Sequence, residues 1–290
     1  MNEIPSVKFK SSYQHIEGVE IISLDTIKEK TGGLYHNSEK PHQLQFYNII
    51  FYTGGQSDQL VDFKWYPVKR NTVVYLAKDQ VTSFKFTPGL QGYCILFTQK
   101  YFEQCFGHLS KELIYRIFNN YLFPPVIGIP QGSDFIDYFN LLCKEFFSEA
   151  KFEKATVLSS LFAVLLVKLE ELKQKTELHI PESSKLLLIS KFTMLVKENY
   201  VVNRNAQFYA KKLLITYKHL NVLCKDILNK TAKQFIDDFI ILEAKRKLVN
   251  SEIKSTELAY SLGFEEPTNF TKYFKKRTGV TPNSFKNQHK

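Results

Sequence analysis

The chain has 290 residues, of which 44% are hydrophobic and 14% aromatic, and its formal net charge is +10. This length suggests about two domains, and the hydrophobic content excludes a disordered chain. Residues 200–290 hold 17 Lys and Arg against 8 Asp and Glu, whereas the first 199 residues hold 22 against 21. A near-neutral front and a basic back indicate a polyanionic partner for the back, either nucleic acid or an anionic membrane surface.

The N-terminal part is rich in short β-branched and aromatic runs that are separated by turn residues. These runs predict antiparallel strands of a small barrel or sandwich. The expected strands cover residues 19–24, 46–52, 60–66, 72–77, 81–86, 92–97 and 126–129. Residues 1–10 lack the apolar run of a signal peptide, and the four cysteines form no Cys-x-x-Cys pair. Both observations predict a protein of the reducing cytoplasm.

Beyond Phe97 the apolar residues recur at the spacing of a helix. Thr98 is expected to cap a helix over residues 99–106, and two amphipathic helices follow over residues 135–150 and 151–174. The apolar stripe of the last helix would pack on the barrel or pair between two subunits. Pairing in a homodimer is favoured because DNA regulators usually read paired half-sites. The most apolar run, residues 157–169, is too short to span a bilayer, so no membrane partner is expected.

A polar, proline-containing stretch over residues 176–184 is predicted to link an N-terminal domain, residues 1–175, to a C-terminal domain, residues 185–290. Everything beyond this linker has a helical pattern. The expected helices cover residues 185–199, 205–214, 217–228, 232–249, 255–262 and 267–278.

An internal repeat divides the C-terminal part. The pattern Ala210-x-x-Leu213 recurs as Ala259-x-x-Leu262, and the pattern of residues 219–225 recurs 50 positions later, in residues 269–275. Two helix-turn-helix units therefore flank the long helix expected over residues 232–249, which would be about 27 Å long. Such a connector would hold two recognition helices roughly one DNA turn, about 34 Å, apart.

The second unit carries a long motif with well-spaced positions. Residues 257–285, ELAYSLGFEEPTNFTKYFKKRTGVTPNSF, resemble the signature of AraC/XylS-type transcription regulators, and the resemblance extends over about residues 185–287. It implies a sequence-specific regulator that binds double-stranded DNA, with RNA polymerase as a further partner. The implied fold is α+β: an N-terminal antiparallel cupin-like β-barrel with flanking helices, then an all-α domain with two helix-turn-helix units joined by a long helix.

In such a protein the outward side chains of the two recognition helices would meet DNA. Asn reads adenine and Lys reads guanine in the major groove, whereas most cationic side chains hold phosphates. The residues assigned to bases are Tyr217, Lys218, Asn221, Thr268, Asn269 and Lys272. Those assigned to phosphates are Lys225, Lys275, Lys276 and Arg277. For each of these residues the alternative is a solvated helix face.

The front domain offers few groups for chemistry. Cupin barrels that bind metals carry a His-x-His pair, but His42 is followed by Gln43 and Leu44. No metal, cofactor or catalytic residue is therefore expected, and the chain is not predicted to be an enzyme. A small-molecule effector would be held by aromatic and polar side chains of the barrel, although most of these residues serve equally well as core. The pocket residues considered are His42, Phe46, Tyr52, Trp65 and Tyr75.

Two alternatives to a specific regulator stay open on the sequence. One is a cupin-type enzyme fused to a helical module, which a stoichiometric metal at His42 would favour. The other is a non-specific basic nucleic-acid-binding protein. Its binding would depend on charge alone and would show no difference between a specific and a scrambled duplex.

Overall fold

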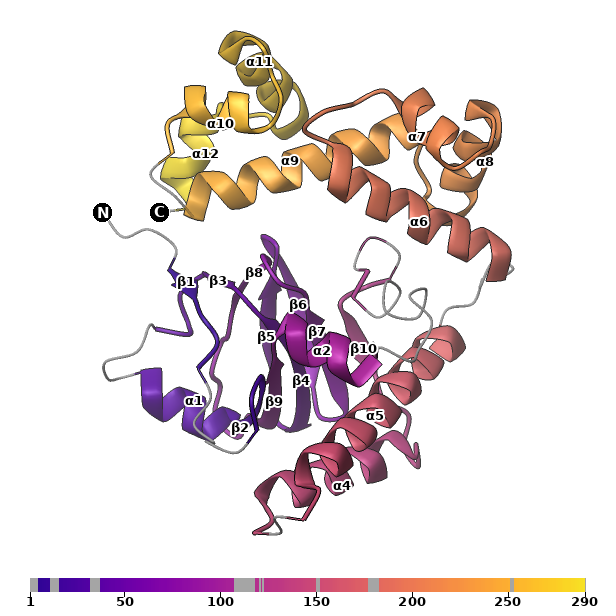
Figure 1. The fold of residues 1–290 in the computed structure, drawn as a ribbon. Helices are drawn as coiled ribbons and strands as arrows, with labels where there is room; N and C mark the ends of the chain where they lie inside the picture. Colours follow the sequence, from indigo (N-terminus) through magenta and orange to yellow (C-terminus); the bar gives the residue numbers. More distant parts are fainter. Residues whose placement is uncertain are drawn as a thin grey trace. The chain divides into compact units, whose positions relative to one another are not determined.

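The structure is a computed structural model that describes residues 5–10, 16–31, 37–106, 118–119, 121, 123–149, 152–176, 183–250 and 253–289. Its contacts separate a unit of Pro5–Leu178 from a unit that holds His179–Lys290. Antiparallel sheets occupy the first unit and helices the second, which confirms the predicted α+β class (Figure 1). Residues 177–182 of the predicted linker lie outside the described residues.

The described residues of the N-terminal unit form two five-stranded sheets. The first runs in the order β1 (Ser6–Val7), β3 (His42–Leu44), β8 (Val81–Ser83), β5 (Gln56–Val61) and β6 (Lys64–Lys69). The second runs in the order β10 (Val126–Gly128), β7 (Thr72–Leu76), β4 (Tyr47–Gly54), β9 (Gln91–Phe97) and β2 (Val19–Ser23). Among the described strands, pairing is antiparallel as predicted except that β1 lies parallel to β3. Closure of these sheets into a barrel stays a prediction.

The second sheet is buried on both faces. Ile49 and Phe51 of β4 pack into a cluster with the helices on one face, whereas Ile50 and Tyr52 pack into a cluster with residues of the other sheet. This alternation follows from the two-residue period of a strand. The helices of the first cluster are α2 (Gln99–Phe106), α4 (Phe135–Phe147) and α5 (Lys154–Thr176), whereas α1 (Leu24–Thr31) contributes Leu24 to the second. Figure 1 shows α4 and α5 lying side by side.

The strand predicted over residues 60–66 is wrong, because a tight turn divides it. Asp62 and Phe63 have φ angles of 48° and 68°, and they join β5 to β6 as a hairpin. A two-residue turn with both φ angles positive matches the right-handed twist of paired strands. In a sequence, Asn-Gly or Asp-Gly usually indicates such a turn, whereas this one is formed by Asp62 and Phe63. Here the apolar alternation continues through the turn and hides it. Pro67 lies within β6, which is an edge strand and tolerates a missing N–H donor.

The C-terminal unit is arranged around its longest helix, α9 (Ala232–Asn250). The other helices are α6 (Ser183–Asn199), α7 (Ala206–Lys212), α8 (Tyr217–Leu228), α10 (Ser255–Ser261), α11 (Pro267–Thr278) and α12 (Pro282–Gln288). Figure 1 shows α7 and α8 near one end of α9, and α10 and α12 near the other. The two predicted recognition helices, α8 and α11, begin and end at the expected residues.

None of the helices in the described part of the chain combines the length and the apolar character that a bilayer crossing requires.

Candidate nucleic-acid interface

The two recognition helices bury equivalent sides. Leu220 and Cys224 of α8 are fully buried, as are Phe270 and Phe274 of α11. Each pair is spaced by four residues, so the side chains halfway between them point out of the domain. The exposed residues that the sequence assigned to DNA are Tyr217, Lys218 and Lys225 on α8, and Thr268, Asn269, Lys272, Lys275, Lys276 and Arg277 on α11.

Local signals position both helices. The hydroxyl of Thr216 accepts a hydrogen bond from the backbone N–H of His219 at 3.1 Å and caps the start of α8. Pro267 occupies the first turn of α11, where a missing N–H is harmless. Asn229 and Gly279 end the two helices in the left-handed conformation, with φ angles of 55° and 81°. The ends of both helices are therefore encoded in their own segments.

Asn221, which was predicted to read a base, joins α8 to α9. Its Oδ1 accepts a hydrogen bond from the backbone N–H of Ala232, at 3.0 Å. Next to it, Thr231 and Gln234 form a capping box: the Thr231 hydroxyl accepts from the Gln234 N–H at 3.1 Å, and Gln234 Oε1 accepts from the Thr231 N–H at 2.8 Å. Because reading adenine bidentately needs both the carbonyl and the amide of asparagine, Asn221 is poorly suited to that contact.

Arg277, which was predicted to hold a phosphate, is exposed and also contacts α9. The carboxylate of Asp237 is 4% exposed, and it accepts hydrogen bonds from Arg277, from the Tyr273 hydroxyl at 2.8 Å and from Lys233 at 2.6 Å. Three donors around one buried carboxylate compensate for its desolvation. Burial, reinforced by the charge of Asp237, raises the pKa of the Tyr273 hydroxyl, which therefore donates as a neutral group.

The sequence contained a signal for this role of Arg277. Arg277 follows the buried Phe270 by seven residues, and this spacing places both on the same side of a helix. Asp237 was missed altogether because its partners on α11, Tyr273 and Arg277, lie 36 and 40 residues further along the chain. In this domain, one polar side chain therefore links each recognition helix to the connector α9: Asn221 for α8, and Asp237 for α11.

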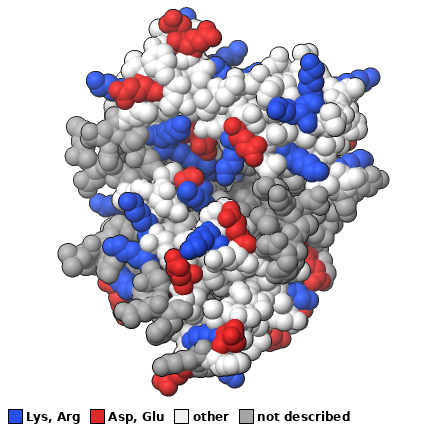
Figure 2. Space-filling model, viewed as in Figure 1, with Lys and Arg blue, Asp and Glu red and all other residues white. Residues whose placement is uncertain are grey.

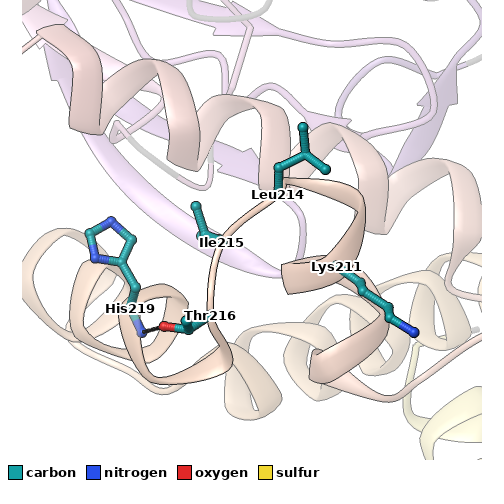
Figure 3. Close-up of a pocket in the computed structure, with 5 residues that line it drawn as sticks. All are labelled: Lys211, Leu214, Ile215, Thr216 and His219. Atoms are coloured by element: carbon teal, nitrogen blue, oxygen red, sulfur yellow. Dashed lines mark hydrogen bonds between the residues drawn. The ribbon is translucent and has the colours of Figure 1, made fainter.

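The turn of the first unit borders an open hollow on the surface. Its lining residues are Lys211, Leu214, Ile215, Thr216 and His219 (Figure 3). Leu214 is 93% exposed and has a φ angle of 58°, which is rarely adopted by a residue with a Cβ atom. Sequence reasoning missed this residue, because nothing in the local pattern distinguishes an exposed leucine from a core leucine.

The basic side chains are not gathered into one patch on the face shown in Figure 2. Lysine and arginine side chains lie there among aspartate and glutamate side chains. The formal excess of positive charge in residues 200–290 therefore indicates a polyanion in general, whereas the individual positions on α8 and α11 determine which contacts can form.

The residues predicted to line an effector pocket do not share one environment. Phe46 and Tyr52 lie in the cluster between the two sheets, whereas Tyr75 lies in the cluster under the helices. Trp65 is 50% exposed on β6, and His42 is buried with its Nδ1 3.0 Å from the Lys40 carbonyl. Phe46 and Tyr52 thus share one cluster.

Between the sheets, a polar chain involves residues that the sequence analysis did not single out. The Tyr52 hydroxyl donates to Gln59 Oε1 at 2.7 Å, and Gln59 Nε2 donates to the Thr82 hydroxyl at 2.6 Å. Burial raises the pKa of Tyr52 well above its usual value, so its hydroxyl stays protonated. Within the described residues no group of three His, Cys, Asp or Glu side chains is placed to hold a metal ion.

Comparisons with known proteins agree with this geometry. Residues 209–288, which include both recognition helices, match the family described as helix-turn-helix domain. The chain is 33% identical over 91 residues to an uncharacterized HTH-type transcriptional regulator in the cgkA 5' region of Pseudoalteromonas carrageenovora. That match covers 31% of this chain and 54% of the relative, so the chain spans about half the length of that curated protein.

Two solved structures are similar at greater distance. Unsaturated fatty acid bound wild-type ToxT from Vibrio cholerae strain SCE256 is 14% identical, with a TM-score of 0.46, over 94% of this chain and 96% of that chain. A transcriptional regulator with an AraC-type DNA-binding domain from Chromobacterium violaceum is 14% identical, with a TM-score of 0.34, over 37% of this chain and 96% of that chain. Likenesses this distant transfer no ligand to this chain. The family match and the paired units together identify residues 209–288 of this chain as a helix-turn-helix domain.

Proposed function

We propose that the chain is a sequence-specific transcription regulator that binds double-stranded DNA through α8 and α11, in successive segments of the major groove. The observation that carries the proposal is the attachment of two recognition helices to one connector, each with an exposed face turned outward. A connector of 19 residues is about 28 Å long, close to the rise of one DNA turn.

The contacts are divided between bases and phosphates. On α11, Thr268, Asn269 and Lys272 lie on the outward face near its start, where a recognition helix meets base edges. Phosphates are assigned to Lys225, Lys275 and Lys276, which are exposed and lie further along their helices. Tyr217 and Lys218 are the remaining candidates for base contacts on α8. We assign Asn221 and Arg277 to the frame of the domain, because both are engaged by α9.

Selection of duplexes from a random library with the intact chain tests the proposal. We expect one preferred sequence that binds at least about a thousandfold more tightly than a scrambled duplex at physiological salt. Lys272→Ala should weaken binding about tenfold and relax the preference at one base pair. Its matched control is Lys276→Ala, which should weaken all duplexes alike and lower the salt slope by about one. Equal binding of selected and scrambled duplexes would instead indicate a non-specific basic protein.

We further propose that two copies of the chain pair through the outer face of α5. Val157, Val164 and Val167 of this helix are 40%, 39% and 41% exposed, although valine is usually buried. Val157 and Val164 are seven residues apart, the repeat of helices that pair with another helix. The mass of the intact chain should be that of a dimer by light scattering, and Val164→Lys should halve it. A monomeric wild-type chain would contradict this proposal.

An effector in the N-terminal unit and a contact with RNA polymerase stay predictions. Of the predicted pocket residues, Phe46 and Tyr52 share one packing cluster, Tyr75 belongs to another, Trp65 is half exposed and His42 is buried outside both clusters. They do not define a ligand site. Transcription in vitro from a promoter that carries the selected duplex would show whether the chain activates or represses the polymerase.

A further inference from the structure

The two recognition helices present different side chains at the same position. Val222 of α8 and Lys272 of α11 are separated by 50 residues, the offset of the repeat. Each lies midway between the two buried residues of its helix, Leu220 and Cys224 or Phe270 and Phe274, and so points directly out of the domain. Val222 is 47% exposed, and Lys272 is also exposed.

An exposed valine at this position is not explained by the stability of the domain. Valine lowers helix propensity, and half of its surface contacts no other part of the protein. Its neighbours one turn away on the same face are Lys218 and Lys225, which are also exposed. The outward face of α8 therefore has the apolar Val222 at its centre, with Lys218 one turn before it and Lys225 one turn after it along the helix.

In the proposed complex this face lies in the major groove. Lys225 would reach a phosphate, Lys218 stays a candidate for a base contact, and the central Val222 would meet base edges. Valine cannot form a hydrogen bond there, and the apolar group that the groove displays is the C5-methyl of thymine. The adjacent Asn221 uses its carbonyl to bind Ala232, so a bidentate adenine contact does not compete for this role.

We infer that Val222 is a specificity-determining residue that contacts a thymine methyl group in the half-site of α8. The inference rests on the proposed function. The equivalent position of the other half-site faces Lys272, which can donate to the O6 and N7 acceptors of guanine. The two half-sites therefore differ at equivalent base pairs: a thymine is preferred opposite Val222, and a guanine opposite Lys272.

Uracil substitution tests this contact, because deoxyuridine lacks only the methyl group of thymidine. Each thymidine of the selected duplex is replaced in turn, and the affinity of the intact chain is measured. One replacement in the α8 half-site should weaken binding about threefold to fourfold, the effect of one lost methyl contact. Val222→Ala should bind the thymidine and deoxyuridine duplexes equally, whereas Val222→Thr, which keeps one methyl group, should retain part of the difference.

Val202 provides the matched control, because it is a valine with 84% exposure outside the recognition helices. Val202→Ala should show the full loss on uracil substitution. The inference is overturned if no replacement weakens wild-type binding, or if the loss persists unchanged in Val222→Ala. In both cases the preference for the selected over the scrambled duplex would remain. Disappearance of that preference in the wild-type chain would instead contradict the proposed function.

Discussion

The two helix-turn-helix units place different residues at the same point of their turns. Leu214 of the first unit and Gly263 of the second have φ angles of 58° and 77°. Leu214 is 93% exposed, whereas a Cβ atom on Gly263 would overlap the carbonyl of Val201. The turn geometry demands a left-handed residue in both units, but close packing demands glycine only in the second.

The segment before α7 accounts for this difference. Arg204 in this segment donates a hydrogen bond to the carbonyl of Gly263, and its guanidinium lies 3.8 Å from the centre of the Phe264 ring. The first unit has an open hollow at its turn instead (Figure 3). In addition, the buried carboxylate of Asp237 holds α11, whereas the neutral amide of Asn221 holds α8. We therefore expect the second unit to be the more sensitive to substitution.

The largest effect is expected at Gly263. Gly263→Ala should lower the free energy of unfolding by about 3 kcal/mol or more, because the added Cβ meets the Val201 backbone and the left-handed conformation is strained as well. Gly279→Ala is the matched control: Gly279 has a φ angle of 81° but nothing within 4 Å of its Cβ position, so it should lose only about 1 kcal/mol. Urea unfolding measures both, and equal losses would contradict the packing argument.

Asp237 is expected to show the next largest effect. Asp237→Ala should cost about 3 kcal/mol in urea unfolding, because it leaves Tyr273 and Arg277 without their buried acceptor. The neighbouring Asp238, whose side chain is 51% exposed, should cost at most about 1 kcal/mol when replaced by alanine. If the two variants are equally stable, the Asp237 cluster does not anchor α11.

Asn221 distinguishes a role in the frame from a role in base reading. Asn221→Ala should lower the free energy of unfolding by about 1 kcal/mol, because the N–H of Ala232 loses its partner. The preferred DNA sequence from library selection should not change. If Asn221→Ala instead changes the preferred sequence at one base pair and leaves the free energy of unfolding unaffected, Asn221 contacts a base.

Leu214 should give the smallest effect, and in the opposite direction. Leu214→Gly relieves the left-handed strain but adds the flexibility of glycine to the unfolded chain, so we expect a net stabilisation of about 0.5 kcal/mol. Leu214→Ala keeps the Cβ atom and should not stabilise. Thermal unfolding compares the two variants, and a stabilisation by alanine would show that exposure of the leucine side chain, not backbone strain, is the cause.

The sequence by itself determined the features that depend on near neighbours. The apolar period and the repeat located α8 and α11 to the residue, and Thr216, Pro267 and Gly279 mark helix ends through contacts within a few positions. The turn at Asp62 and Phe63 shows where this information ends, because their residue types do not announce the left-handed backbone that joins β5 to β6.

Only the tertiary structure decided which polar side chains of the recognition helices also form hydrogen bonds to α9. Asn221 and Lys272 belong to residue types that suit a DNA surface equally well, yet the amide of Asn221 binds an N–H eleven residues away. Arg277 binds a carboxylate forty residues away. A hydrogen bond forms where two groups meet in space, and distant segments meet only when the helices pack, so composition and spacing alone cannot assign these side chains.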